Sequence, residues 1–274
     1  MSAIGSLTVR GARGSMPVSG TSTSRHGGRT TCFSVDLGGG ELLIIDCGTG
    51  LTLADDLQPT APTLFHVFLT HYHLDHVIGL PMYRPLFSPG NTFVFHGPVP
   101  EGRTIEEAVA APFAGTLFPV SLADAAAEKR FVTVGDDPVE IGALTVTPFP
   151  LRHPQGATGY RLDSGTRSVV IATDHETGDP TFDTRLIEVA TGADVLIHDA
   201  QYTPDEYEAR RIGWGHSTWS HAVDIAVAAG VRRLVLTSHD PFRSDGAVDA
   251  IVNDASSRFG DVVAAYEGMT IPLG

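Results

Sequence analysis

Four side chains that can bind a metal ion lie within six residues, directly after an apolar stretch typical of a buried strand. The stretch is Leu64–Thr70, and residues 71–76 that follow it read His-Tyr-His-Leu-Asp-His. Extended backbone places His71 and His73 on one face, where both can bind the same ion. A turn and the start of a helix would direct Asp75 and His76 toward a second ion. Imidazole and carboxylate ligands suit zinc, and also manganese or iron.

A surface turn that carries these residues by coincidence is the competing interpretation of residues 71–76. Four ligand-type residues within six positions, directly after a buried strand, disfavour this interpretation. The chain also contains 12 histidines and 32 acidic residues, which favours metal chemistry elsewhere in the sequence too.

Alternating or β-branched runs bounded by glycine predict strands along much of the chain. The predicted strands are Leu7–Arg10, Cys32–Leu37, Glu41–Asp46, Leu64–Thr70, Thr92–His96, Leu144–Pro148, Ser168–Thr173, Val195–Asp199 and Arg233–Ser238. Helices are predicted over Phe182–Ala190 and Ala247–Phe259, and from an N-cap at Ser217 or Thr218 to Gly230. Strands come early and alternate with helices later, and there is no repeat or linker. We therefore expect one α/β domain over residues 1–274, with two mixed sheets between helix layers.

The charge of the chain argues against a long nucleic acid as partner. The net charge is −14, Lys129 is the single lysine, and no run of Lys or Arg exceeds two residues. Proteins that bind long nucleic acids usually present a basic face to the phosphates. A small substrate bound at a metal site agrees better with this composition.

Targeting signals and disulfides are not expected. The first ten residues lack the basic and apolar regions of a signal peptide, and no apolar run approaches the roughly 20 residues of a membrane span. We therefore expect a cytoplasmic protein without a membrane partner. Cys32 and Cys47 could pair in principle, but two cysteines do not form a disulfide framework.

The pattern His-x-His-x-Asp-His resembles the signature of the metallo-β-lactamase superfamily, and the other parts of that pattern follow in order. The upstream aspartate of the family is matched by Asp46, its third histidine by His153, its bridging aspartate by Asp174 and its last histidine by His239. Each lies at the end of a predicted strand. The resemblance covers about the whole chain and implies a four-layer αββα sandwich of two mixed β-sheets flanked by helices.

The resemblance also implies two divalent metal ions, with zinc expected and manganese or iron as alternatives. One ion would bind His71, His73 and His153; the other would bind Asp75, His76 and His239, and Asp174 would bridge both. Asp46 would orient a ligand histidine; a structural role in capping the following loop is compatible with this. A pair of metals lowers the pKa of a bound water and supplies hydroxide near neutral pH.

A second motif distinguishes branches of the superfamily. The run Gly215-His216-Ser217-Thr218 resembles a motif of the ribonuclease Z-like phosphodiesterases, in which the histidine assists departure of the leaving oxygen. His216 would then be a general acid, oriented by Asp199, and we expect Asp75 and His216 to act in catalysis. A helix cap with an incidental histidine is the alternative.

Two further features refine the resemblance. The segments 11–15 and 26–32 resemble the glycine-rich segments of the same branch, but Arg29 replaces the usual asparagine. Arg29 could contact a phosphate or be a surface charge. His153 and Asp174 are 21 positions apart (174 − 153), which leaves no room for the long tRNA-binding arm of tRNA-processing members. This layout resembles the cyclic-phosphate phosphodiesterases related to phosphonate breakdown.

We therefore expect a phosphodiesterase that acts on a small or cyclic phosphate ester through a metal-bound hydroxide. A metal-dependent acyl hydrolase of lactones or thioesters is the main alternative, and an RNA-processing endonuclease or a non-catalytic regulatory protein are weaker ones. Homodimerisation is an expectation from the family. His66, His96 and His221 are expected in core or surface positions, whereas His175 and His198 lie beside the metal edge.

Overall fold

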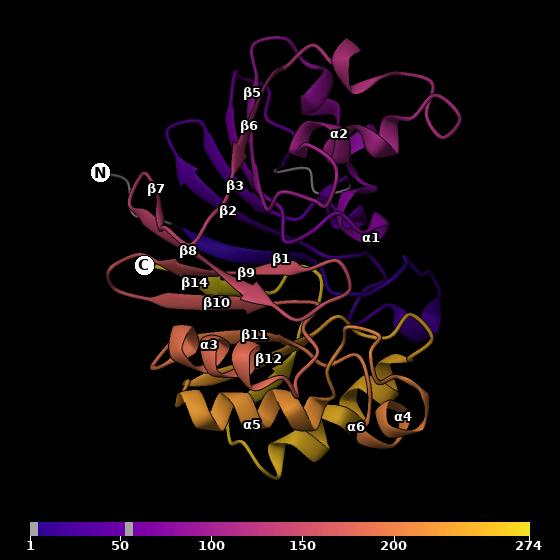
Figure 1. The fold of residues 1–274 in the computed structure, drawn as a ribbon, viewed down its shortest axis with the longest axis vertical. Coiled ribbons are helices and arrows are strands. Elements are labelled where there is room, and N and C mark those ends of the chain that lie inside the picture. Colours follow the sequence, from indigo (N-terminus) through magenta and orange to yellow (C-terminus); the bar gives the residue numbers. More distant parts are fainter. Residues whose placement is uncertain (1–4, 53–56) are drawn as a thin grey trace.

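The computed structural model describes residues 5–52 and 57–274, which form two seven-stranded sheets packed face to face. Helices cover the outer face of each sheet (Figure 1). The αββα sandwich predicted from the sequence is thus confirmed. Residues 1–4 lie outside the described residues. They belong to the first ten residues, for which the sequence analysis expected no signal peptide.

The first sheet is built from the N-terminal half of the chain together with the last strand. Its order is β14-β1-β2-β3-β4-β5-β6, and β3 to β6 run parallel to one another. Its strands are β1 Ser6–Gly11, β2 Cys32–Gly38, β3 Glu41–Ile45, β4 Leu64–Phe68, β5 Thr92–Gly97, β6 Glu128–Thr133 and β14 Thr270–Pro272.

The second sheet has the order β13-β12-β11-β10-β9-β8-β7. The strands β10 to β13 are parallel, whereas β7 to β10 pair antiparallel through tight turns. Its strands are β7 Val139–Ile141, β8 Leu144–Leu151, β9 Ala157–Asp163, β10 Ser168–Ala172, β11 Val195–Asp199, β12 Arg233–Thr237 and β13 Val262–Ala264.

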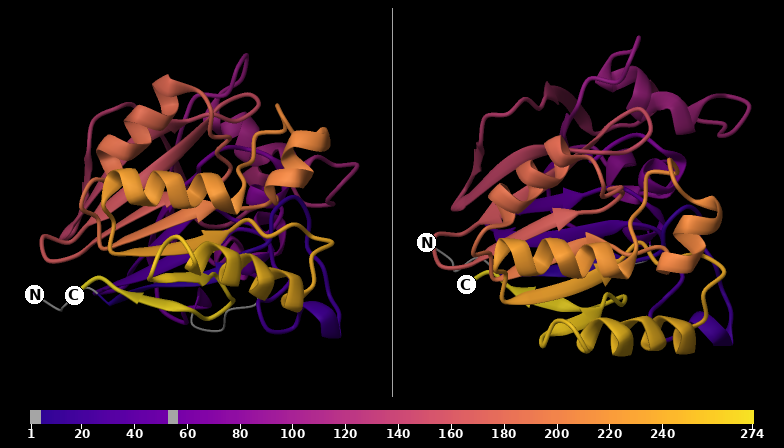
Figure 2. Two further views of the ribbon diagram at one scale, coloured as in Figure 1. Left: turned by 90° about the horizontal axis from the view of Figure 1, so that it is seen from below. Right: turned by 60° about the horizontal axis from the view of Figure 1, so that its bottom comes forward.

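Six α-helices complete the described fold, and they are α1 Leu74–Val77, α2 Ile105–Ala110, α3 Pro180–Ala190, α4 Pro204–Arg210, α5 Trp219–Ala229 and α6 Asp245–Ser256. Figure 2 shows α3, α5 and α6 on the outer side of the second sheet. The side chain of Thr218 caps the N-terminus of α5 by accepting from His221 N, and Gly230 ends it with φ of 64°. This is the N-cap and stop that the sequence predicted.

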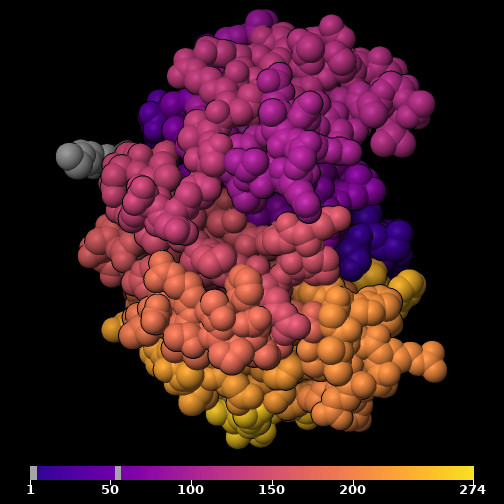
Figure 3. Space-filling model, viewed as in Figure 1, coloured from indigo at the N-terminus to yellow at the C-terminus, as the bar shows by residue number. Residues whose placement is uncertain are grey.

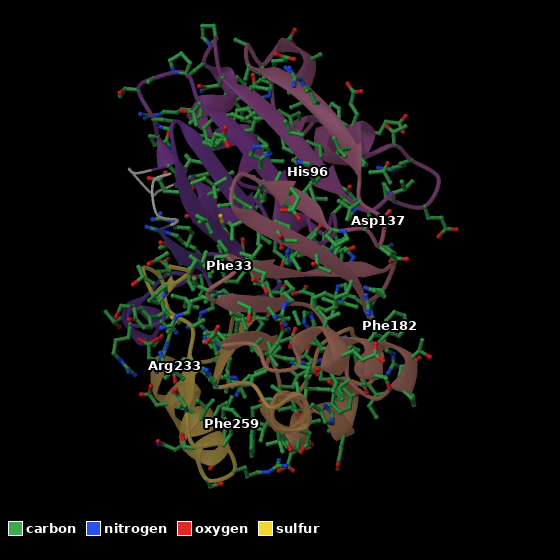
Figure 4. The ribbon with its side chains drawn as sticks, turned by 90° about the vertical axis from the view of Figure 1, so that its left-hand side faces the viewer. Phe33, His96, Asp137, Phe182, Arg233 and Phe259 are labelled. Carbon is green, nitrogen blue, oxygen red and sulfur yellow. The ribbon has the colours of Figure 1, made fainter. Side chains whose placement is uncertain are left out.

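Three apolar cores hold the layers together. The core between the sheets includes Phe33, Phe68 and Tyr160, and Figure 4 labels Phe33 in this interior. Separate cores lie between each sheet and its helices. Burial of both faces explains why strands such as β3 and β10 read as continuous apolar runs.

The sequence-based assignment missed several short elements. The strands β6, β7, β9, β13 and β14 and the helices α2 and α4 were not predicted. β6 has mostly exposed or half-buried residues, so it lacks the apolar alternation on which the prediction relied. The predicted strand Leu64–Thr70 ends at Phe68 in the structure, because the Thr70 amide donates to the Asp46 side chain instead of continuing the sheet ladder.

Several strands end at one common edge of the sandwich. In Figure 1, α1 and α4 lie at this edge, on the right, while the C-terminus lies at the left. Asp46 and Ser238 directly follow β3 and β12, and one residue separates Asp174 from the end of β10. All three adopt left-handed backbone, with φ of 59° for Asp46 and 56° for the other two. The chain therefore turns sharply where the predicted site residues lie.

Candidate metal centre

Histidines from two separate segments meet at the common edge. The ligand atoms of His71, His73 and His153 lie within 4.8 Å of one another, and so do those of His71, His76 and Asp174. His73 Nδ1 and His153 Nε2 are 3.0 Å apart. The motif after β4 and the turns after β8 and β10 thus bring five of the expected ligands together in two adjoining groups. His71 belongs to both groups, whereas the sequence analysis expected Asp174 to be the shared residue.

Each of the four histidines has its outer ring nitrogen fixed by a hydrogen bond. The pairs are His71 Nδ1 with Thr70 Oγ1 at 3.0 Å, His76 Nδ1 with Asp46 Oδ2 at 2.7 Å, His153 Nδ1 with Gly215 O at 2.7 Å, and His73 Nε2 with Gln155 Oε1 at 3.0 Å. Bonds of this kind set the tautomer and the ring orientation of metal-binding histidines. The four inner nitrogens remain on the side where a cation can bind, and two of them, those of His73 and His153, contact each other.

Two of these inner nitrogens are buried without a partner. Among the described residues, Nε2 of His71 and Nε2 of His76 make no hydrogen bond. They lie 3.7 Å and 3.3 Å from Asp174 Oδ2. A buried polar atom without a partner is destabilising. A cation between these nitrogens and the carboxylate would give both nitrogens a partner.

The charges of the site favour a cation at the same place. Burial acts to lower the pKa of His76, but the carboxylates of Asp174, Asp75 and Asp46 outweigh it and raise that pKa well above its usual value. Burial lowers the pKa of His71 far below its usual range and that of His153 to about 4. These two rings are neutral at pH 7, the form in which imidazole binds metal. The residues therefore fit a metal centre.

Asp75 and His239 lie at the border of these groups. Asp75 Oδ2 is 3.4 Å from His76 Nε2 and accepts a hydrogen bond from Ser15 N at 2.8 Å. His239 Nε2 is 3.0 Å from Ala265 O, and the described groups of close ligand atoms do not include His239. Burial lowers the pKa of His239 to about 3, so its ring is neutral. Its role as a ligand stays a prediction.

His216 lies beside the cluster. It forms a third close group with His153 and Asp174, and its Nδ1 lies 2.6 Å from Asp199 Oδ2. Burial acts to lower the pKa of His216, but Asp199 and Asp174 raise it to about 9. Because Asp199 occupies Nδ1, Nε2 is the free nitrogen of a ring that readily carries a proton.

A buried carboxylate that the sequence analysis missed fixes the loop before His216. Glu176 Oε1 accepts from Tyr207 Oη and Gly213 N at 2.7 Å, and its Oε2 accepts from Gly215 N at 2.8 Å. Gly215 has φ of 86°, and a Cβ there would lie 2.2 Å from the His153 ring. The loop therefore needs glycine, and Glu176 connects the turn after β10 to the segment that carries His216.

The glycine-rich segment uses its amides internally. Gly28 N and Arg29 N both donate to Glu267 Oε1 at 2.8 Å, and Arg29 Nε lies 3.3 Å from Glu267 Oε2. The sequence left open whether Arg29 contacts a phosphate or is a surface charge. In the structure its side chain pairs with the carboxylate of Glu267. The anion that these amides contact is a side chain of the protein itself.

The remaining histidines and cysteines have structural surroundings. His96, labelled in Figure 4, stacks on Phe68 with ring centroids 4.3 Å apart. His175 Nε2 lies 3.1 Å from Asp183 Oδ1, and Cys32 and Cys47 are both free and buried. In the described part of the chain, no helix has the length and apolar character that crossing a membrane requires.

The two packed sheets and the histidine–carboxylate cluster at their common edge define a metal-dependent hydrolase of the metallo-β-lactamase fold. Residues 42–239 match the family described as "Beta-lactamase superfamily domain". The chain belongs to the metallo-β-lactamase superfamily, in the branch of ribonuclease Z and the PhnP-like proteins.

Individual relatives span nearly the whole chain. A protein of Myxococcus xanthus named ribonuclease Z is 30% identical, with 85% of this chain and 89% of that protein covered. A diphosphatase from the PhnP family is similar in structure, with a TM-score of 0.69, 20% identity, and 98% of each chain covered. Zinc-bound PqqB from Methylobacterium extorquens has a TM-score of 0.71 and 16% identity, with 98% of this chain and 100% of that chain covered.

Proposed function

We propose that this protein is a metal-dependent phosphodiesterase that hydrolyses a small or cyclic phosphate ester. The observation that carries the proposal is the pair of Asp199 and His216 beside the metal centre, with Nδ1 of His216 2.6 Å from the carboxylate. A histidine fixed in this way can give a proton to a leaving oxygen. An alkoxide leaving group needs that proton, because without it the group is a strong base.

The names of the relatives support a phosphorus substrate. Ribonuclease Z and a diphosphatase both appear among them, and both names refer to cleavage of bonds to phosphate. The zinc in the name of the PqqB structure supports zinc in this chain, which the histidine-rich ligand set also favours.

Charge and topology support a small substrate over a long polynucleotide. Only β9 and β10 lie between His153 and Asp174, so this chain has no additional arm at that place. The net charge of −14 opposes binding of a long polyanion. A small-molecule phosphate ester is therefore the partner we propose.

The metal-binding residues and His216 would have separate roles in hydrolysis. Divalent cations held at this site would supply a hydroxide nucleophile at neutral pH and would stabilise charge on phosphoryl oxygens. His71, His73, His76, His153 and Asp174 would bind them, joined by Asp75 and His239. His216, oriented by Asp199, donates its Nε2 proton to the departing ester oxygen as the P–O bond breaks. One water is consumed, and a phosphomonoester and an alcohol are formed.

The test is turnover of bis(p-nitrophenyl) phosphate by protein reconstituted separately with zinc and with manganese. We expect metal-dependent release of p-nitrophenolate, and loss of it in Asp174→Ala. Protein with two metals demonstrably bound and no turnover of this diester or of cyclic phosphates would contradict the proposal and favour lactone or thioester substrates.

A further inference from the structure

A cavity of about 650 Å³ opens directly beside the histidine cluster. His71 and His73 of the cluster are among the residues that line it. One wall comes from the segment that follows β5 and from α2 with the residue after it. The other wall comes from residues 154–158, which form the turn between β8 and β9 and the start of β9. Figure 3 shows the purple segment near residue 100 above the pink chain near residue 155 on one face. The volume suits a small molecule.

Most of the wall formed by the segment after β5 and by α2 is apolar. Pro98, Val99, Pro100, Ala108 and Ala111 line it, and Val99 is 61% exposed. The hydroxyl of Tyr72 donates to Pro98 O at 2.8 Å. This bond ties the apolar wall to the metal-binding motif, so the cavity keeps a fixed position relative to the metal centre.

Two charged side chains, Glu101 and Arg103, complete the lining. Within the described residues, neither forms a side-chain hydrogen bond or an ion pair. The Arg103 charge adds to the lowering of the pKa of Glu107, which hydrogen bonds with Thr104 mainly cause. Other arginines near the active edge differ, because Arg29 pairs with Glu267 and Arg243 with Glu206. The Arg103 guanidinium is thus available to a ligand.

We propose that this cavity binds the non-reacting part of the substrate, a compact apolar group that ends in an anionic group paired with Arg103. The inference rests on the proposed function and names its substrate class. A guanidinium presents a fork of N–H donors that matches a carboxylate or phosphate. In a chain of net charge −14, this local cation also offsets the long-range repulsion of an anionic substrate.

Glu101 has the opposite role in this arrangement. Its carboxylate lines the same cavity and repels a terminal anion. Removal of the Glu101 charge is therefore expected to improve binding of an anionic substrate, whereas removal of the Arg103 charge weakens it. Substitutions at Glu101 and Arg103 should therefore change the binding of an anionic substrate in opposite directions.

The experiment compares two esters with the same leaving group, phenyl p-nitrophenyl phosphate and 4-carboxyphenyl p-nitrophenyl phosphate. The readout is the ratio of their kcat/KM values in zinc-loaded protein. We expect the carboxylate ester to be preferred about three- to tenfold. Arg103→Gln should bring the ratio close to one, and Glu101→Gln should raise it. Arg84→Gln, on an exposed arginine outside the cavity, should leave it unchanged.

A ratio near one in the wild type, or a ratio insensitive to Arg103→Gln, would overturn the subsite and leave the phosphodiesterase proposal standing. If neither ester is hydrolysed, the phosphodiesterase proposal fails. In that case, calorimetry tests the subsite on its own by comparing the affinities of the protein for phenylphosphonate and 4-carboxyphenylphosphonate. Tighter binding of the carboxylate compound that is lost in Arg103→Gln supports it, and equal affinities overturn it.

Discussion

The Asp46 carboxylate lies 2.7 Å from Nδ1 of His76, and both side chains are fully buried. The same carboxylate accepts from the amide and the hydroxyl of Thr70, both at 2.8 Å. Asp46 therefore orients a histidine of the metal centre and also satisfies the backbone of the turn after β4. The sequence analysis considered a structural role for Asp46 in the loop that follows it; the hydrogen bonds to Thr70 instead stabilise the turn after β4.

Replacing Asp46 by asparagine should weaken metal binding. Asparagine can still occupy the site, but it removes the charge that fixes the His76 tautomer. We expect a loss of roughly 10- to 100-fold in metal affinity, measured by competition with a chromophoric chelator. Asp137→Asn, at an exposed position labelled in Figure 4, should match the wild type. Equal affinity in the two variants would contradict the role of Asp46.

Replacing His216 by alanine should lower turnover without lowering metal content. The expected loss is roughly 10²- to 10⁴-fold for a cyclic phosphate such as 2′,3′-cyclic AMP, whose ring opening releases an alkoxide. The loss should be much smaller for bis(p-nitrophenyl) phosphate, because p-nitrophenolate leaves without a proton. Metal content is measured by elemental analysis. An equal loss on both substrates would argue against proton donation by His216.

Replacing Glu176 by glutamine should destabilise the loop that precedes His216. The glutamine amide brings N–H donors to a place where Gly213 N, Gly215 N and the Tyr207 hydroxyl already donate. We expect the free energy of unfolding to fall by about 1–3 kcal/mol, measured by urea denaturation. Glu208→Gln, on the exposed side of α4, is the matched control and should change it little.

The stability contributed by Asp245 should depend on pH. Burial acts to raise the pKa of Asp245, but the amides of Arg25 and His26 donate to its carboxylate and hold that pKa below its usual value. Its contribution is therefore fully present above the unfolded-state pKa of about 4 and is lost as the pH falls through the lower folded-state pKa.

Asp245→Asn should accordingly reduce the free energy of unfolding by about 1 kcal/mol at pH 7. The difference from the wild type should shrink as the pH falls below 4. Denaturation of both proteins across this pH range is the measurement, with Asp254→Asn on the exposed side of the same helix as control. A difference that is independent of pH would mean that the carboxylate charge is not its cause.

The sequence predicted the parts of the site that are local in the chain or follow directly from a strand. The spacing of residues 71–76 predicted that these side chains lie together, and the resemblance to the superfamily implied His153 and Asp174 as their partners. The fold class followed from the same alternation of strands and helices. Asp199 and His216 were also expected to interact, and they do.

Contacts between segments far apart in the chain were not predictable in this way. Gln155 reaches His73 from a turn with φ of 67°, and neither glutamine nor that turn has a sequence signal. Glu176 follows Asp174 by two residues, yet its partners lie 31 to 39 residues away. The contact of His239 with Ala265 depends on β13, which immediately precedes Ala265. With three residues, β13 is too short to show a periodic pattern.

The left-handed turns at Asp46, Asp174 and Ser238 bear on any attempt to engineer this protein for heat resistance. Non-glycine residues in this conformation are strained by roughly 1–2 kcal/mol each, although aspartate tolerates it better than most. Glycine would relieve that strain at all three turns, and at two of them it would delete a carboxylate of the site. At Asp46, however, the loss of three buried hydrogen bonds would outweigh that gain, so Ser238 is the turn at which a change to glycine can raise the melting temperature and leave both carboxylates in place.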